Sequence, residues 1–164
     1  DRDINTINGL LKAQKDQTLE KVEALVDTAS NLQKQIEQLN QKLASLQAGE
    51  LLSQVQSIAG RATLITTVEN MDAKALRNLH DGVKSKLENA VIVLAGVEGD
   101  KVSLIASVAK DFTASIKAGD IIKHLATELG GKGGGKPDLA QGGAPLNEKF
   151  APVMADLTAW LAAK

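Results

Sequence analysis

Apolar residues in the first third of the chain follow heptad spacing. From position 19 to position 46 they recur at steps of three and four, with one stammer near Ala29 where two steps of three adjoin. The positions between them are mostly Gln, Lys, Glu and Asn, as on the exposed face of a helix. The pattern predicts one long amphipathic helix over about 16–47, with this apolar stripe: Leu19, Val22, Val26, Ala29, Leu32, Ile36, Leu39, Leu43 and Leu46.

A helix with a single apolar stripe cannot bury that stripe alone, so this one must pack on a second helix or on a second copy of itself. Candidate partners within the chain are the segments 4–14 and 50–58, with "QAGE" at 47–50 as a turn between helices. Gln33 and Asn40 stand where a continuous heptad would place apolar residues, which favours a helical hairpin over a long symmetric coiled coil. The sequence leaves open whether the stripe packs within one chain or in a homodimer.

From about Arg61 the pattern changes to short apolar runs. "ATLITTVE" at 62–69 is rich in β-branched residues and predicts a strand. The near-continuous apolar runs at 90–96 and 101–108 predict two strands covered on both faces, joined by a hairpin at "VEGD".

Helices are predicted around these strands. Asp72 is a suitable N-cap for the first, over 71–89, whose stripe contains Leu76 and Leu79. The second covers 118–130 and would end at Gly130 or Gly131, and the last carries Pro152 in its first turns. We therefore expect an α+β fold, with an N-terminal long-helix hairpin region followed by a small mixed β-sheet domain packed with helices. The expected boundaries are 1–58 for the helical subdomain and 59–164 for the globular domain, with a glycine-rich loop at 130–143.

That loop, "GGKGGGKPDLAQGG", contains seven of the fourteen glycines of the chain. The string from Gly130 to Lys136 matches a Walker phosphate-binding loop, but Pro137 stands where Ser or Thr should hold magnesium, and the string follows a predicted helix rather than a strand. Two interpretations stay open. Either the glycine backbone and its two lysines face a phosphate, or the loop caps the preceding helix and fills a crowded corner against the sheet.

Composition narrows the possible functions. With 164 residues, a formal net charge of −1, no cysteine and three aromatic residues, the chain has no disulfide, no thiolate zinc site and no platform of stacked aromatic rings. No apolar run is long enough to span a membrane, so we expect no membrane partner. Because the chain begins with Asp1 rather than Met, we expect a piece of a longer protein.

Few other residues suggest chemistry. His80 and His124 lie far apart on different predicted helices, so we expect surface or edge histidines and no metal site. No Ser-His-Asp set or pair of catalytic carboxylates can be assembled, and we expect neither catalytic residues nor a cofactor in this chain.

Trp160 falls on a helical stripe and is expected to pack in the core. Arg77, Lys84 and Lys86 lie among Asp81 and Glu88, as on an ordinary solvated face.

The glycine-rich stretch is very similar to the signature of the DHH-associated domain, which follows DHH phosphoesterase domains and ends alanyl-tRNA synthetases. The synthetase family has Arg or Lys at the position of Lys136, followed by Pro-Asp and Ala-Gln, as in this chain. Three further segments resemble that family: "LLKAQKDQTLEKVEALVDTASNLQKQIEQL", "MDAKALRNLHDGVKSKL" and "AGDIIKHLATELGGKGGG".

The resemblance implies a C-terminal module that binds tRNA(Ala) at its elbow, supports aminoacylation and editing, and contributes to oligomerisation in the cytoplasm. The family's catalytic parts lie elsewhere, so ATP, Mg and Zn would belong to other domains. The elbow is a folded backbone surface, which suits a glycine-and-lysine loop without aromatic residues. Alternatives are the C-terminal substrate-binding domain of a DHH phosphoesterase and a purely structural dimerisation module. The expected nucleic-acid-binding residues are Gly131, Lys132, Gly133, Gly134, Gly135 and Lys136, with Arg77, Lys110 and Lys123 as further candidates.

Overall fold

A computed structural model describes all residues from Asp1 to Lys164 and divides them into two compact units, Asp1–Asn40 and Gln41–Lys164. The first unit contains helix α1 (Arg2–Leu11) and most of helix α2 (Thr18–Leu51). The long helix predicted over 16–47 is therefore confirmed. The predicted turn at 47–50 is wrong, because these residues continue α2, and Gly49 lies on an open side of the helix with no atom near the position of a Cβ.

The apolar stripe of α2 is not buried in either unit. Helix α1 has no buried residue, although the Thr18 hydroxyl donates a hydrogen bond to the side-chain oxygen of Asn8. The predicted helical partner at 50–58 is also wrong, because the chain forms a short 3-10 turn, η1 (Leu52–Gln54), and then strand β1 (Gln56–Ile58). The large exposed apolar residues of α2 are Leu19, Val22, Leu25, Val26, Leu32, Ile36, Leu39, Leu43 and Leu46.

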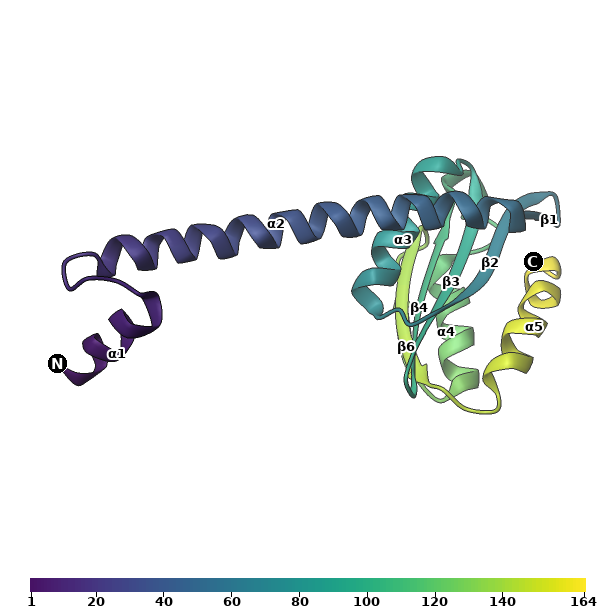
Figure 1. Cartoon of the computed structure of the whole chain (residues 1–164). Coiled ribbons are helices and arrows are strands. Elements are labelled where there is room, and N and C mark those ends of the chain that lie inside the picture. The colour runs from purple at the N-terminus through teal and green to yellow at the C-terminus, as the bar shows by residue number, and fades with distance from the viewer. The chain divides into compact units, whose positions relative to one another are not determined.

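The second unit is built on a six-stranded mixed sheet with the strand order β1-β2-β3-β4-β6-β5 (Figure 1). Only β2 and β3 are parallel, and helix α3 connects them; the other neighbours are antiparallel. The α+β class and the three predicted strands are confirmed. The remaining elements are β2 (Arg61–Glu69), α3 (Ala73–Lys86), β3 (Ala90–Glu98), β4 (Lys101–Val108), η2 (Lys110–Phe112), α4 (Ala118–Leu129), β5 (Lys132–Gly135), β6 (Leu139–Pro145) and α5 (Phe150–Ala162).

Strand β3 is apolar along its length because helices cover both of its faces. Ile92 and Leu94 pack with α3 and the last turns of α2, whereas Val91 and Val93 pack with α4 and α5 (Figure 1). The end of α2 belongs to this unit because Ala44 and Ala48 are buried, and a Cβ on Gly82 of α3 would lie 3.2 Å from the Cβ of Ala48.

The ends of the helices follow the sequence. The Asp72 carboxylate accepts a hydrogen bond from the Ala75 N–H at 2.8 Å, and Gly130 ends α4 with a φ of 78°. Pro152 lies in the first turn of α5. The glycine-rich stretch, in contrast, is not a loop, because β5 and β6 form an antiparallel hairpin there. No helix in the chain is both long enough and apolar enough to cross a membrane.

Candidate nucleic-acid interface

Most glycines of the β5–β6 hairpin are explained by close packing within the protein. Gly133 and Gly142 are cross-strand partners, and a Cβ on either would lie within 2.8 Å of the Ile122 Cγ2 of α4. A Cβ on Gly135 would lie 2.6 Å from the Ala140 Cα, and one on Gly131 would overlap Gly143 and Ala144. Any side chain at these positions would force β5, β6 and α4 apart.

Gly134 differs from these glycines because no atom lies within 4 Å of the position of a Cβ. Alternation along β5 places Gly134 and Lys132 on the side of the hairpin that faces away from α4. We call the residues on this side, Lys132, Gly134, Gln141 and Gly143, the hairpin face; they are two directly opposed pairs in the register of β5 and β6. This face combines an accessible glycine backbone with a lysine, and packing does not explain its glycine at 134.

The turn between β5 and β6 is fixed by hydrogen bonds on both sides. The N–H groups of Ala118 and Gly119, at the start of α4, donate to the carbonyl oxygens of Pro137 and Lys136 at 2.8 and 3.1 Å. On the other side, the Val108 N–H of β4 donates to the backbone carbonyl oxygen of Asp138 at 3.0 Å. Because the turn already occupies these two amides of α4, an anion near it would be bound mainly by lysine side chains.

Two hollows lie on either side of this turn. The smaller hollow, of about 210 Å³, is lined by Lys117, Lys123 and Lys136 together with Asp120 and the glycines at 134 and 135. All three lysines are exposed, and they outnumber the single carboxylate. This hollow is therefore a local positive site in a chain whose net charge is −1.

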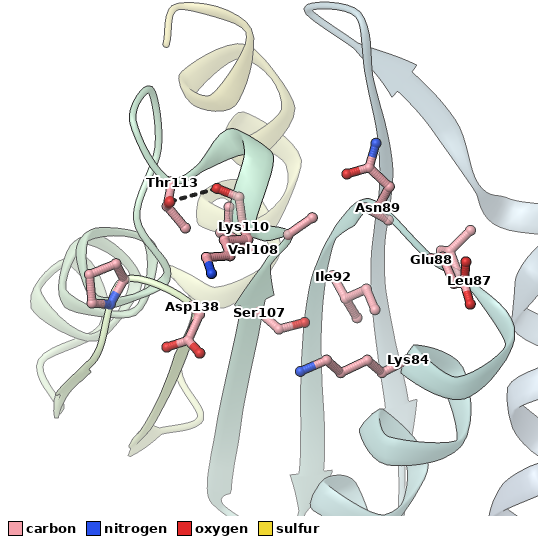
Figure 2. A pocket seen from close by; sticks show the side chains of 13 residues that line it. Lys84, Leu87, Glu88, Asn89, Ile92, Ser107, Val108, Lys110, Thr113 and Asp138 are labelled. Carbon is pink, nitrogen blue, oxygen red and sulfur yellow. Dashed lines mark hydrogen bonds between the residues drawn. The ribbon is translucent and has the colours of Figure 1, made fainter.

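The larger hollow, of about 620 Å³, lies between α3, β3, β4 and the turn. Figure 2 shows Lys84 of α3 and Asp138 of the turn reaching towards it from opposite sides, with Ile92 and Ser107 between them. Lys110 also lines this hollow, and Glu88 and Asp138 balance the two lysines. With equal numbers of positive and negative groups, this hollow attracts a polyanion less than the smaller one does.

His80 of α3 is buried, with 1% of its surface exposed, so the expectation of a surface or edge histidine is wrong here. Its Nε2 lies 2.7 Å from the Ser107 Oγ, whereas its Nδ1 has no hydrogen-bond partner and lies 3.5 Å from an Asp81 oxygen. Burial lowers the pKa of His80, and the neighbouring Asp81 carboxylate only partly offsets this. Ser107 is itself only 3% exposed, so we interpret the pair as a structural hydrogen bond between α3 and the sheet.

His124 and Trp160 join α4 to α5. Their rings stack in parallel, with centroids 4.5 Å apart, and both are partly exposed. Trp160 therefore packs at the edge of the core, against the cluster formed by α4 and the sheet.

The structure brings together only part of the predicted set. Lys123 and Lys136 share the smaller hollow and Lys132 lies on the adjacent hairpin face, whereas Lys110 lines the larger hollow. Arg77 is exposed on α3 and lines neither hollow. The sequence analysis did not include Lys117, which also lines the smaller hollow. The one feature that could have indicated it is its position immediately before α4.

Comparisons with known proteins agree with the fold. Residues 60–163 match the DHHA1 domain family. The chain is 48% identical over its whole length to the alanine–tRNA ligase of Psychrobacter sp. (strain PRwf-1), and 44% identical over 98% of its length to that of Pseudoalteromonas translucida. In each case the chain spans 18% of the relative's length.

Two solved structures are similar in fold to this chain. The C-Ala domain of Aquifex aeolicus alanyl-tRNA synthetase superposes with a TM-score of 0.59 and 28% identity, covering 66% of this chain and 97% of that domain. A DHH domain from the s1p family of ribosomal proteins, 19% identical with a TM-score of 0.52, shares the fold; the match covers 88% of this chain and 34% of that one.

Proposed function

Because this chain belongs to the DHHA1 domain family, we propose that it is the C-terminal tRNA-binding module of an alanine–tRNA ligase. In this proposal it binds tRNA(Ala) at the elbow in the cytoplasm and supports aminoacylation and editing by other domains. ATP, Mg and Zn would be bound by those domains. The similarity to a C-Ala domain and to alanine–tRNA ligases along the whole chain supports this assignment.

The observation that carries the proposal is the positive edge formed by the β5–β6 hairpin. Lys132 lies on the hairpin face beside the open backbone of Gly134, and Lys117, Lys123 and Lys136 surround the adjacent hollow. Lysine ammonium groups and accessible backbone amides bind phosphates without reading base sequence. This is the chemistry needed to contact a folded RNA backbone, because the site has no aromatic ring on which a base could stack.

A salt titration tests the proposal directly. The affinity of the chain for tRNA(Ala) should fall steeply with salt, and Lys132→Ala combined with Lys136→Ala should lower the slope of log K against log[salt] by about 1.5, since each lost phosphate contact removes about 0.7–0.9. The matched control is Lys21→Ala with Lys34→Ala, which removes two exposed lysines of α2, an element that takes no part in the hairpin. An equal change of slope in both double variants would contradict the assignment to the hairpin.

The same titration with an acceptor minihelix that lacks the elbow tests where the module binds. If the elbow is the contact, intact tRNA(Ala) should bind more tightly and with the steeper slope. Equal binding of both RNAs would contradict elbow recognition, and absence of tRNA binding would contradict the proposed function.

A second role, self-association through α2, is favoured by the exposed apolar stripe of that helix. Water-exposed leucines at heptad spacing are typical of a helix that packs on another helix. We propose that two copies of the chain pair along this stripe to form a homodimer.

A further inference from the structure

Helix α3 covers only part of its side of the sheet. It packs over β3 and β4, with Leu76, Ile92 and Ile105 in one buried cluster. The last turns of α2 lie next to it over β2, where Ala48 and Leu64 belong to the same cluster. Beyond β4 come β6 and β5, whose α3 side carries the hairpin face and no covering helix. We call this part of the sheet, beside α3, the uncovered stretch.

Two rows of opposed residues lead from beneath α3 across the uncovered stretch to the edge of the sheet. Residues of such a row share one face, because side chains alternate between faces only along a strand. With neighbouring strands about 4.8 Å apart, the end of each row on β5 lies about 10 Å beyond β4. Each row ends in a lysine; one consists of Gly96, Ser103, Gly143 and Lys132, and the other of Ile92, Ser107, Leu139 and Lys136.

Arg77 and Lys84 lie on the flank of α3 that faces the uncovered stretch. Gly82, which lies against Ala48 of α2, marks the opposite flank. At about 100° per residue, Arg77 and Lys84 are about 140° and 160° around the helix from Gly82. Figure 2 shows Lys84 extending from α3 towards Ser107 of β4. Arg77 lies two turns, or about 10 Å, nearer the start of the helix.

Both cations also lie near His80, which contacts β4 beneath this flank. Burial is the main cause of the lowered pKa of His80, and the charges of Lys84 and Arg77 add to it against the opposing effect of Asp81. Both cations are exposed, and neither belongs to the one close pair of opposite charges in the chain, between His80 and Asp81. They are therefore available to an anion outside the protein.

We infer that RNA bound at the hairpin also contacts α3, with Arg77 and Lys84 binding phosphates opposite the two lysines of the hairpin. The inference rests on the proposed binding of tRNA and adds a second row of cations to it. Between the rows lies the exposed Gly143, which has no side chain to keep an RNA backbone away from the sheet. Lys132 and Lys136 are about 13 Å apart along an extended chain, so the four cations surround an area rather than follow a line. Such an arrangement suits a folded RNA, which is recognised by the shape of its backbone.

Salt titration of the binding of tRNA(Ala) to the whole chain tests the contact with α3. Arg77→Ala and Lys84→Ala should each lower the slope of log K against log[salt] by about 0.8, and their combination by about twice that, because each removes one phosphate contact. Arg77→Lys keeps the charge and should keep the slope. The matched control is Lys86→Ala, which removes an exposed lysine two residues after Lys84, on the other flank of the same helix, and should leave the slope unchanged.

Asp81 provides a test of opposite sign. Its side chain is 66% exposed and lies between Arg77 and Lys84 in the helix, so its charge repels a phosphate bound to either of them. Asp81→Asn should therefore raise the affinity for tRNA(Ala) about two- to threefold, the usual size of an interaction between exposed charges. An unchanged or lowered affinity would contradict a phosphate on this flank.

The outcomes separate this inference from the proposed function. An unaltered slope in the variants of Arg77 and Lys84 would overturn the contact with α3, and so would an equal change in Lys86→Ala. If Lys132→Ala with Lys136→Ala still lowers the slope in that case, tRNA binding at the hairpin stands. Absence of tRNA binding by the wild type would reject both proposals. All the α3 variants replace exposed side chains, so their Tm should equal that of the wild type, which shows that altered binding does not reflect unfolding.

Discussion

At the residue scale, buried polar groups show how the fold constrains single side chains. His80 lies between Leu76, Leu79 and Val83 in the buried stripe of α3, and its ring reaches Ser107 on β4. The hydrogen bond between Nε2 and the Ser107 Oγ satisfies one ring nitrogen, and burial lowers the pKa of the imidazole. The histidine thus acts as a polar core residue that joins helix and sheet.

The lowered pKa of His80 predicts that acid destabilises the chain. In the unfolded chain the imidazole has a pKa near 6.5, whereas burial lowers it in the folded state. Below about pH 6.5 the unfolded state therefore binds a proton that the folded state does not, and the free energy of unfolding falls as the pH decreases towards the folded pKa. We expect urea denaturation to show this loss between pH 7.5 and 5.5, and His80→Gln to reduce it. An identical pH dependence in the variant would contradict the assignment.

At the element scale, the β5–β6 hairpin shows two uses of glycine in one strand. A Cβ at Gly133 would lie 2.6 Å from Ile122 and 2.7 Å from Gly142, whereas the neighbouring Gly134 has open space. Gly133→Ala should therefore destabilise the chain by about 1–3 kcal/mol, the usual cost of overpacking. Gly134→Ala should change the free energy of unfolding by less than about 0.5 kcal/mol, as at an ordinary surface position. Urea denaturation of both variants measures this difference, and equal values would show that the hairpin is not pressed against α4.

The elements that the sequence predicts correctly are those with a strong apolar pattern. Strands β3 and β4 and helix α2 have continuous or periodic apolar positions, so their prediction needs no knowledge of the rest of the fold. Strands β5 and β6 contain so much glycine that no alternation is visible. They are strands only because β6 pairs with β4 and β5 pairs with β6. The buried His80 did leave a signal, because position 80 falls between 76 and 83 on the apolar face.

The candidate site was predictable only in part for a similar reason. Resemblance to a family selected the glycine-rich stretch, but spacing along the chain cannot show which lysines meet in space. Lys123 lies thirteen positions before Lys136 and shares its hollow, whereas Lys110 lines the other hollow and Arg77 neither.

At the scale of the whole molecule, charge and apolar surface are distributed unevenly. A chain with a net charge of −1 gathers four lysines at the hairpin and the adjacent hollow, and it exposes a row of leucines along α2. The lysines provide a surface for an RNA backbone, and the leucines provide one for another helix. In our proposal, binding of tRNA and self-association therefore use different surfaces and can be altered separately.

That separation predicts the effect of polar substitutions in the stripe. Leu39 and Leu43 are 63% and 55% exposed, so replacing both with Asp removes no buried contact within one chain. If a second copy covers them, the wild type should show a concentration-dependent mass in analytical ultracentrifugation that reaches that of a dimer. The double variant should stay monomeric, with a lower thermal stability, because charges replace an apolar contact between helices.

The matched control is Gln38→Asp with Lys42→Asp, at exposed polar positions of the same helix, and it should leave the mass distribution unchanged. A wild type that is monomeric at every concentration would contradict self-association, and so would a double variant that keeps both its mass and its stability.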